Sequence, residues 1–392
     1  MIETKFKQTE LGLIPEDWEV CKIGDFTDIV TGATPSTENS DYWNGHIRWM
    51  NSSELNNKII FEVHGRISKE GYDSASTHML PTNCVLIGLA GQGKTRGTSA
   101  INKVELCTNQ SIGAILPSEN IDSDYLYLYM DGQYQKLRTI SSGDGGRGGL
   151  SKTLLLNFEI VKPNDIGEQK LVAEVLNDVD KLIRELDTLI EKKRSIMQGT
   201  MQDLLTAHCR LPGFVHPWRD TLVEKCCKIT TGGSNTQDQI ESGIYPFYIR
   251  SATVMRSNSY IFDCEGVITI GDGQIGKVFH YVNGKFDLHQ RCYLMYDFDN
   301  VDAKFFYFLF SFFFYNRVIA LSAKATVDSV RRNMIAKMKI NIPSTMQEQN
   351  AIASILSDMD AEIEELEAKR DKYIAVRQGM MQQLLTGKIR LI

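Results

Sequence analysis

The sequence lacks two features that would place a protein in or across a membrane. Residues 1–20 carry charged side chains throughout and contain no apolar stretch of the kind found in secretion signals. The most apolar run, Phe305–Tyr315, spans 11 residues, whereas a membrane helix needs about 20. We therefore expect this run to form a buried aromatic helix, and we expect a cytoplasmic protein with no membrane contact.

Motifs for metal or redox sites are also missing. No cysteine belongs to a Cys-x-x-Cys pair, and no group of histidine and cysteine residues has zinc-ligand spacing. In a protein without a secretion signal, cysteines are normally reduced. We therefore expect eight free thiols and no bound metal. The cysteines are Cys21, Cys84, Cys107, Cys209, Cys226, Cys227, Cys264 and Cys292.

Motifs for common enzyme reactions are likewise absent. There is no Gly-x-Ser-x-Gly, no His-Glu-x-x-His and no Pro-Pro-aromatic motif for methyl transfer to an amino group. His280 and His289 lie near predicted strands without an obvious partner, which is typical of ordinary core or surface histidines. The sequence thus predicts no catalytic site and no cofactor held by this chain.

Two glycine-rich motifs resemble cofactor sites, but their context disagrees. Gly88–Thr95 matches the P-loop pattern after the apolar run Cys84–Ile87. A P-loop must open a helix, and Arg96–Ser99 are poor helix formers as a group. Gly271–Gly276 matches the dinucleotide pattern, yet Lys277–Val282 alternates like a strand. A P-loop nucleotide hydrolase stays open as an alternative function.

There is no excess of basic charge, since the formal net charge is −6. Residues 168–194 contain seven acids and six bases, and residues 348–372 contain eight acids and three bases. The rest of the chain has 34 of each and is neutral. The acidity therefore belongs to two segments, and local basic clusters elsewhere can still bind phosphates.

These two acidic segments belong to an internal duplication. Glu168–Leu211 aligns without a gap on Glu348–Leu391, 180 residues later, and 19 of the 44 pairs are identical. Further upstream the offset is 200, which pairs Trp18 with Trp218 and places the two Thr-Gly pairs at 31–32 and 231–232 in register. The first copy therefore has about 20 extra residues, which we expect in loops.

Each duplicated segment predicts a long amphipathic helix. In the first, apolar residues repeat in heptads, with a second stripe at steps of seven. The heptad residues are Val172, Val175, Val179, Leu182, Leu186 and Leu189, and the second stripe is Leu176, Ile183 and Ile190. Two such helices most simply pack on each other, and the alternative is that each packs on its own domain. A helix over Glu168–Thr206 would be on the order of 58 Å long.

The globular parts read as mixed α and β. Short β-rich runs, Cys84–Ile87, Gly266–Ile270 and Lys277–Val282, alternate with glycine-rich turns, and Tyr125–Gln135 and Phe305–Tyr315 are predicted as single buried helices. The predicted fold is α+β: two globular domains joined by a long antiparallel helical coiled coil, with an internal pseudo-two-fold repeat. The predicted parts are residues 1–163, 164–211, 212–343 and 344–392.

Both glycine-rich motifs occupy the same place in their domains, which favours one loop used twice over two different cofactor sites. Such a loop offers amides, and its Gln, Lys and Arg side chains can bind DNA bases or phosphates. A second pair of loops, Ser141–Gly149 and Ser322–Arg332, also carries bases. The candidate DNA-contacting residues are Gln92, Lys94, Thr95, Arg96, Gln274 and Lys277 in the first pair, and Arg147, Lys324, Arg331 and Arg332 in the second.

Several segments resemble the specificity subunits of Type I restriction-modification systems. The opening Leu11–Trp18 resembles the start of these subunits, and so does Leu211–Trp218 in the second half. The Glu-Gln at the start of each long helix and the Gln-Gly, Met-Gln and Leu-Leu-Thr residues near its end also match the family. The resemblance covers essentially the whole chain, in the right order and twice.

This resemblance implies a protein that recognises DNA without catalysing a reaction. Each globular half would be a target recognition domain reading one part of a bipartite sequence in double-stranded DNA. The helices would set the spacing and dock two methyltransferase subunits, which hold S-adenosylmethionine and methylate adenine N6. Two motor-nuclease restriction subunits would complete the complex. A coiled-coil scaffold with no DNA role is the remaining alternative.

Overall fold

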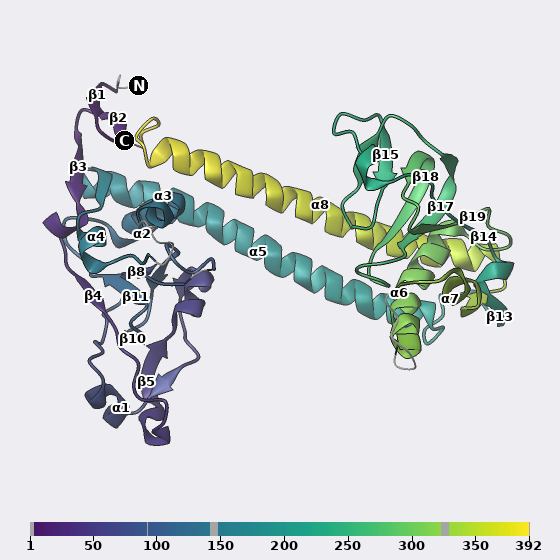
Figure 1. Cartoon of the computed structure of the whole chain (residues 1–392), viewed down its shortest axis with the longest axis horizontal. Helices are drawn as coiled ribbons and strands as arrows, with labels where there is room; N and C mark the ends of the chain where they lie inside the picture. The colour runs from purple at the N-terminus through teal and green to yellow at the C-terminus, as the bar shows by residue number, and fades with distance from the viewer. Residues whose placement is uncertain (1–3, 92, 142–147, 323–328, 392) are drawn as a thin grey trace. The chain divides into compact units, whose positions relative to one another are not determined.

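A computed structural model describes residues 4–91, 93–141, 148–322 and 329–391 of the chain. The chain forms two compact units, one made of residues 1–185 and 370–392, the other of residues 186–369 (Figure 1). Each unit combines a mixed α and β globular part with portions of both long helices. The predicted division into residues 1–163, 164–211, 212–343 and 344–392 follows the order of the sequence and stays a prediction.

The first unit is built around a five-stranded sheet in the order β4-β11-β8-β9-β6. Its strands are β4 (Ile29–Thr31), β11 (Ile112–Ile115), β8 (Val85–Gly88), β9 (Ser99–Asn102) and β6 (Ile59–Ile60). Side chains alternate between the two faces, so Val85 and Ile87 join one apolar core whereas Leu86 joins another. Because both faces are covered, the strand reads as a continuous apolar run, and the predicted strand Cys84–Ile87 is confirmed with a shift of one residue.

The second unit repeats this sheet in the order β14-β19-β17-β18-β15-β16. Its strands are β14 (Lys228–Thr231), β19 (Cys292–Tyr296), β17 (Phe262–Ile270), β18 (Phe279–Leu288), β15 (Tyr245–Tyr248) and β16 (Met255–Ser257). Neighbours are antiparallel except β15 with β18, just as β6 is parallel to β9 in the first unit. The duplication predicted from the sequence is therefore a duplication of topology, although few residues of the two sheets are identical.

The extra residues of the first unit do not form loops, and that expectation was wrong. They fold into a second, three-stranded sheet in the order β10-β5-β7, beside a short helix. The elements are β10 (Cys107–Thr108), β5 (Trp43–Met50), β7 (Arg66–Ile67) and α1 (Lys69–Ser74). Trp43 and Trp49 pack edge to face with ring centroids 5.1 Å apart, and Trp49, Ile67 and Cys107 form a small separate core. Aromatic burial of this kind stabilises a sheet where a loop would remain open.

The remaining short elements flank these sheets. A hairpin of β1 (Phe6–Thr9) and β2 (Gly12–Pro15) precedes the first sheet, and α4 (Lys152–Leu156) and α7 (Arg332–Ala336) follow the two candidate loops near residues 145 and 325. In each unit a two-stranded ribbon leads to a long helix. The ribbons pair β3 (Trp18–Lys22) with β12 (Glu159–Pro163) and β13 (Trp218–Leu222) with β20 (Lys339–Pro343).

The predicted helix Tyr125–Gln135 is in fact two helices, α2 (Ser123–Gly132) and α3 (Tyr134–Ile140). The break falls at Gln133, whose ψ of 11° is not helical, directly after a glycine. Tyr125 to Met130 are all buried, which explains why this stretch is apolar on every side.

The predicted helix Phe305–Tyr315 lies inside the longer helix α6 (Ala303–Ser322). Ala303–Leu321 is long and apolar enough to cross a membrane by length and composition alone. However, Phe305, Phe306, Phe310 and Phe314 are all fully buried in the core of the second unit. These four phenylalanines are therefore core residues of their own unit, as expected, whereas Tyr315 of the same helix is exposed.

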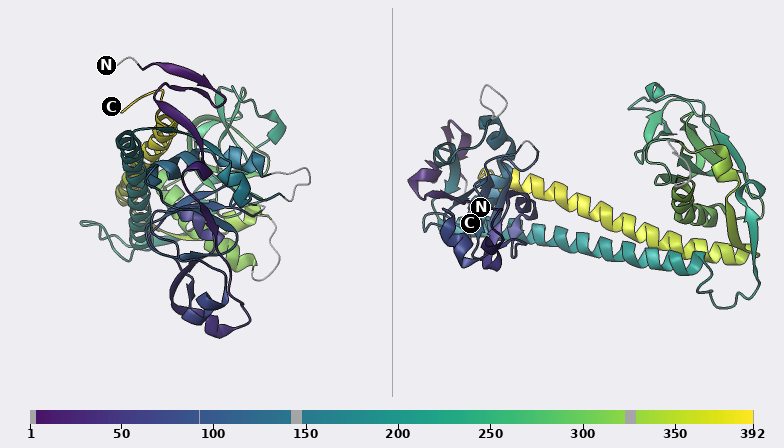
Figure 2. Two further views of the ribbon diagram at one scale, coloured as in Figure 1. Left: turned by 90° about the vertical axis from the view of Figure 1, so that its left-hand side faces the viewer. Right: turned by 60° about the horizontal axis from the view of Figure 1, so that its bottom comes forward.

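The long helices are α5 (Ile166–Leu205) and α8 (Met346–Leu384). The start of α5 and the end of α8 pack into the core of the first unit, through residues such as Leu176 and Leu384. The start of α8 and the end of α5 do the same in the second unit, through residues such as Leu356 and Leu205. Within each unit the two helices lie side by side and antiparallel (Figures 1 and 2). Portions of both helices therefore pack into the core of each unit, and Leu189 of the heptad stripe is exposed. The coiled coil stays a prediction.

The Glu-Gln pair at the start of α5 is buried and joins three parts of the first unit. Glu168 accepts hydrogen bonds from the Trp18 indole at 3.3 Å and from the Arg390 guanidinium at 2.7 Å. The amide oxygen of Gln169 accepts from the backbone N–H of Asp122 at 2.8 Å, just before α2. This pair thus ties the ribbon, the buried helix and the segment after α8 to one helix start.

The second unit repeats this arrangement with the equivalent residues. Glu348 accepts from the Trp218 indole at 3.1 Å and from Arg210 at 2.7 Å and 2.8 Å. Gln349 accepts from the backbone N–H of Asp302 at 2.8 Å. These side chains are identical in both copies because a buried charge must keep its partners.

Candidate nucleic-acid interface

In the second unit, the two loops singled out in the sequence meet. The carbonyl of Gly271, at the end of β17, accepts from the backbone N–H of Val330 at 2.7 Å, and Asp272 forms a β-bridge with Ser329. Gln274 and Lys277 are exposed beside this junction. Two predicted sites that are more than 50 residues apart in sequence therefore form one surface.

The first unit brings its two loops together in the same way. The carbonyl of Leu89, just after β8, accepts from the backbone N–H of Leu150 at 2.9 Å. Lys94 is exposed, Thr95 is half-buried, and the half-buried Arg96 guanidinium donates to the carbonyl of Gly148. The same backbone contact thus recurs in both units, whereas the side chains around it differ.

The glycine-rich loops do not have the strand-to-helix structure that the two cofactor motifs require. The P-loop match is followed by strand β9, so no helix N-terminus is present to bind a phosphate. Directly after the match, the backbone N–H of Gly97 donates to the carbonyl of Gly88 at 2.8 Å and that of Thr98 to the carbonyl of Thr95 at 3.0 Å, as in a turn between two antiparallel strands. The dinucleotide match at Gly271–Gly276 likewise leads into strand β18. The P-loop hydrolase interpretation is therefore not supported.

Three of the predicted contact residues, Gln92, Arg147 and Lys324, lie outside the described residues. Arg331 and Arg332 are both exposed at the start of α7, directly after the Val330 junction. The predicted residues of the second unit that the structure describes are therefore all exposed at or beside one junction. In the first unit, Arg96 is half-buried and its guanidinium already donates to the carbonyl of Gly148.

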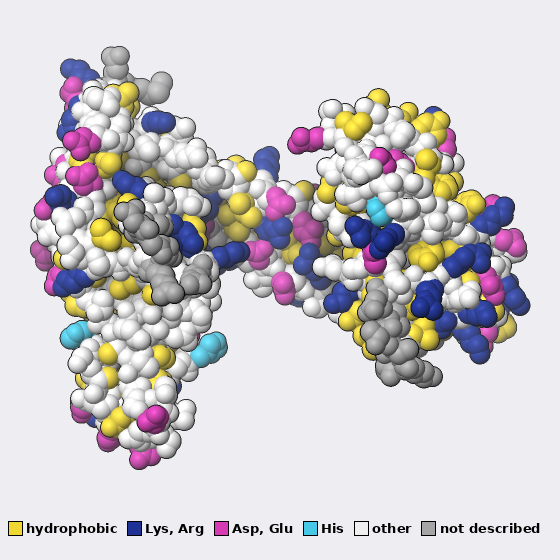
Figure 3. Space-filling view, in the orientation of Figure 1, with side chains coloured by type: hydrophobic (Ala, Val, Ile, Leu, Met, Phe, Trp, Pro, Cys, Tyr) yellow, Lys and Arg dark blue, Asp and Glu magenta, His cyan; other side chains and the backbone are white. Residues whose placement is uncertain are grey.

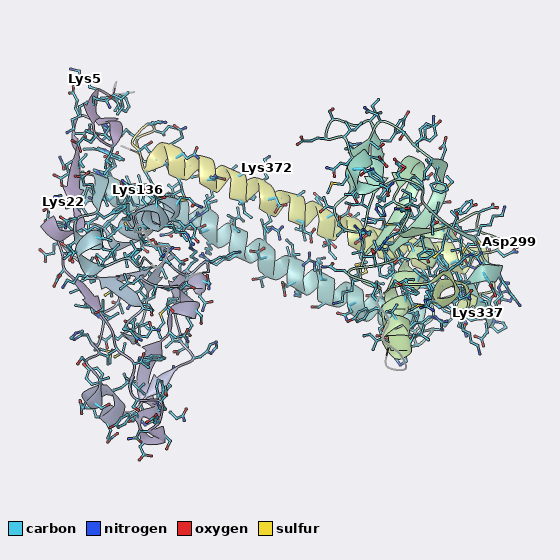
Figure 4. All side chains as sticks on the ribbon, in the orientation of Figure 1. Lys5, Lys22, Lys136, Asp299, Lys337 and Lys372 are labelled. Carbon is cyan, nitrogen blue, oxygen red and sulfur yellow. The ribbon has the colours of Figure 1, made fainter. Side chains whose placement is uncertain are left out.

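Basic side chains gather on the second unit around this region. Figure 3 shows many Lys and Arg side chains on its visible face, in dark blue. Lys337, which follows α7 and is labelled in Figure 4, is exposed on the same unit. The unit can therefore present a local positive surface to a phosphate backbone although the whole chain carries a net charge of −6.

Two arginines at this surface were missed in the sequence. Arg250 and Arg291 donate to the same carboxylate oxygen of Asp272, at 3.1 Å and 2.7 Å. Burial alone would raise the pKa of Asp272, but the hydrogen bonds from Arg291 and Arg250 outweigh it and leave the pKa below its usual range. Asp272 lies within the glycine-rich loop. An acidic residue in a loop expected to bind DNA could have indicated that basic side chains lie beside it.

The described residues contain no group of His, Cys, Asp or Glu that could hold a metal ion. All eight cysteines are free, as predicted. Burial raises the pKa of the Cys84 and Cys292 thiols to about 12, so these two are poor nucleophiles at neutral pH.

With this geometry in place, comparison with known proteins identifies the family. The model of the Type I restriction modification DNA specificity domain matches residues 15–193 and again residues 223–374. The chain belongs to this family. As a Type I specificity subunit, it is a DNA-recognition component with two recognition domains, and it acts in complexes with DNA and other subunits.

Individual relatives agree with this assignment. The MjaIX specificity subunit of Methanocaldococcus jannaschii is 33% identical over 202 residues, which cover 48% of this chain and about half (45%) of that protein. The MjaVIII specificity subunit of the same organism is 22% identical over 424 residues, covering 99% of this chain and 97% of the other. The crystal structure of the S subunit from M. genitalium shares the fold, with a TM-score of 0.69, 15% identity, and coverage of 97% and 98%. The scaffold alternative is not supported.

Proposed function

We propose that each globular part reads one part of a bipartite DNA sequence through its pair of joined loops. The observation that carries this proposal is the repeated junction, Gly271 with Val330 and Leu89 with Leu150, which holds different side chains on the same backbone frame. Glutamine, lysine and arginine at such a junction can bond base edges and phosphates. Phosphate contacts would position the domain, and base contacts would select the sequence.

The long helices act as the spacer in this proposal. A helix of 40 residues such as α5 is about 60 Å long, and half-sites read on one face of DNA lie roughly 34 Å apart. Two such helices packed as an antiparallel coiled coil would fix the number of unread base pairs. The acidic outer surface of α8 suits a protein partner better than direct contact with DNA.

We further propose that the chain is non-catalytic and that it assembles in the cytoplasm. Two methyltransferase subunits would bind S-adenosylmethionine and transfer its methyl group to adenine N6, and two motor-nuclease subunits would complete the restriction complex. This chain would hold no cofactor itself. The absence of methyl-transfer motifs from its sequence supports this division of roles.

The test is to co-express the chain with the methyltransferase subunit of its system and to sequence the host DNA with detection of modified bases. We expect methylation within one two-part motif. Exchange of residues 18–163 for the corresponding part of a relative should change one half of the motif and leave the other half and the spacing intact. Methylation that follows no two-part motif would overturn the proposal, and so would an exchange that changes both halves.

A further inference from the structure

The cluster of Asp272, Arg250 and Arg291 joins three separate segments of the second unit. Asp272 lies between β17 and β18, Arg250 between β15 and β16, and Arg291 between β18 and β19. Both guanidiniums donate to the Oδ2 atom of Asp272, while its Oδ1 atom is buried and has no hydrogen-bond partner among the described residues. The carboxylate of Asp272 thus holds both guanidiniums through one of its oxygen atoms.

The exposure of the three side chains decides which of them can act outward. The side chain of Asp272 is 16% exposed, whereas those of Arg250 and Arg291 are 43% and 63% exposed. A guanidinium has five N–H donors, and the bond to Asp272 uses one donor of each arginine. Arg291 therefore keeps an exposed edge of donors while one bond to Asp272 limits its orientations. Such preorganisation lowers the entropy lost when a ligand binds.

The backbone of Arg291 is also held on both sides. Its N–H donates to Nδ1 of His289 at 3.0 Å, and its carbonyl accepts from the N–H of Gly271 at 2.7 Å. His289 is 4% exposed. Its burial and the nearby Arg250 lower the pKa of the imidazole, which keeps Nδ1 free to accept a hydrogen bond near neutral pH. The position of Arg291 is thus set by the frame of the fold.

The first unit has the same frame with other side chains. Ser111 stands where Arg291 does, because its carbonyl accepts from the N–H of Leu89 at 2.8 Å and its own N–H donates to the side chain of Asn109 at 3.1 Å. Ala90 follows Leu89 as Asp272 follows Gly271. Ser111 and Arg291 thus share the same backbone position but differ in side chain. A residue that determines specificity needs such a position, because its side chain can change while the fold is kept.

We propose that Arg291 reads a guanine in the half-site bound by the second unit, and that Asp272 and Arg250 position it. Arginine bonds the O6 and N7 atoms of guanine through two parallel N–H groups in the major groove, which is the most common specific contact to a base. The inference rests on the proposed DNA-reading function and adds the residue and the base. Asp272 and Arg250 are positioning residues, since they act through Arg291.

The test compares variants of the intact chain co-expressed with its methyltransferase, with modified DNA sequenced as above. Wild type should require a guanine at one position of the half-site that the domain exchange assigns to the second unit. Arg291→Ala should weaken that preference roughly 5- to 150-fold at this single position. Arg291→Lys keeps the charge and loses the two-pronged geometry, so it should relax the same position. Asp272→Asn should give a smaller loss there.

The control is Arg256→Ala, which removes an exposed arginine of the same unit that donates to the carbonyl of Ile244 at 3.2 Å. Its motif should equal that of wild type. The inference is overturned by a wild-type half-site without guanine, by an unchanged motif in both Arg291 variants, or by equal weakening at every position, which would indicate a phosphate contact. A wild type with no two-part motif would instead overturn the proposed function itself.

Discussion

The aspartates at positions 180 and 360 are repeat equivalents, yet the structure predicts opposite effects for the same substitution. Both are identical in the aligned helices and both are half-buried. In the first unit, Asp180 accepts from the Arg377 guanidinium at 2.9 Å, and Arg377 also bonds Asp131 at 3.3 Å. Met197 stands in the second unit where Arg377 stands in the first. Among the described residues, Asp360 makes no ion pair.

The surroundings of Asp360 disfavour its charged form. Burial raises the pKa of this carboxyl, and the nearby Glu364 and Glu367 raise it further. Because the folded state then binds the proton more readily than the unfolded state, the second unit gains stability as the pH falls through the raised pKa toward the ordinary value of an aspartate. At neutral pH the charged Asp360 is a cost to folding.

The two magnitudes follow from these contacts. Asp180→Asn leaves Arg377, whose side chain is 20% exposed, with Asp131 alone. Removing a partner from a buried pair costs about 3–5 kcal/mol when nothing replaces it, so the remaining bond suggests a loss of about 1–3 kcal/mol. Asp360→Asn relieves a like-charge contact with Glu364 at i,i+4, which is about 0.2–0.5 kcal/mol, and also relieves the burial of a charge. We expect a gain of about 0.5 kcal/mol or more.

Hydrogen exchange measured by mass spectrometry resolves the two units and therefore suits this prediction. At pH 7, peptides of the first unit should lose protection in Asp180→Asn, and peptides of the second unit should keep or gain it in Asp360→Asn. The gain should shrink in urea titrations as the pH is lowered toward the ordinary pKa of an aspartate, because wild-type Asp360 then takes up its proton. Asp178→Asn and Asp358→Asn, at exposed equivalent positions, should be neutral. A similar loss of stability in both half-buried variants would contradict the opposite roles assigned to Asp180 and Asp360.

Two further predictions test the frame itself. Gly232→Ala would place a Cβ 2.0 Å from the carbonyl oxygen of Leu288, so it should unfold the second unit or lower its free energy of unfolding by roughly 3 kcal/mol or more. A Cβ at Gly233 meets nothing within 4 Å, so Gly233→Ala should change the melting temperature of the unit little. Equal melting temperatures of the two variants would contradict the close approach at Gly232. Arg390→Met leaves Glu168, which is 2% exposed, without its charged partner. In denaturant titration, the free energy of unfolding of the first unit should fall by about 3–5 kcal/mol. A loss below about 1 kcal/mol would show that this ion pair does not stabilise the unit.

The long helices and the duplication could be predicted because their signals are local and repeated. Heptad spacing and a gapless alignment place α5 within two residues of its observed start at Ile166. The break at Gln133 was missed because one residue with non-helical ψ leaves the apolar pattern on both sides unchanged. The small sheet around β5 was missed because β5 pairs with strands that are distant in the sequence, as Trp49 does with Cys107.

Part of the candidate site could be predicted from the sequence and part could not. The glycine-rich loops could be located from sequence, since glycine spacing is a local signal. The Arg250–Asp272–Arg291 cluster could not, because its members are brought together by the order of the strands and the direction in which each strand ends. Their pairing depends on tertiary structure, and a charged residue in an isolated loop is usually only solvated.

At the starts of the two long helices, identity between the copies marks buried contacts. Glu168 and Glu348 are 2% and 1% exposed, and each keeps its tryptophan and its arginine. By contrast, Ser111 and Arg291 share a backbone frame and differ in side chain. A recognition domain can change its target without losing its fold only if the frame and the reading side chain are separate groups of atoms. The hydrogen bonds that hold the backbone at residue 291 use its N–H and carbonyl, which any residue except proline can supply. The side chain at this position can therefore change with the DNA target without loss of the frame.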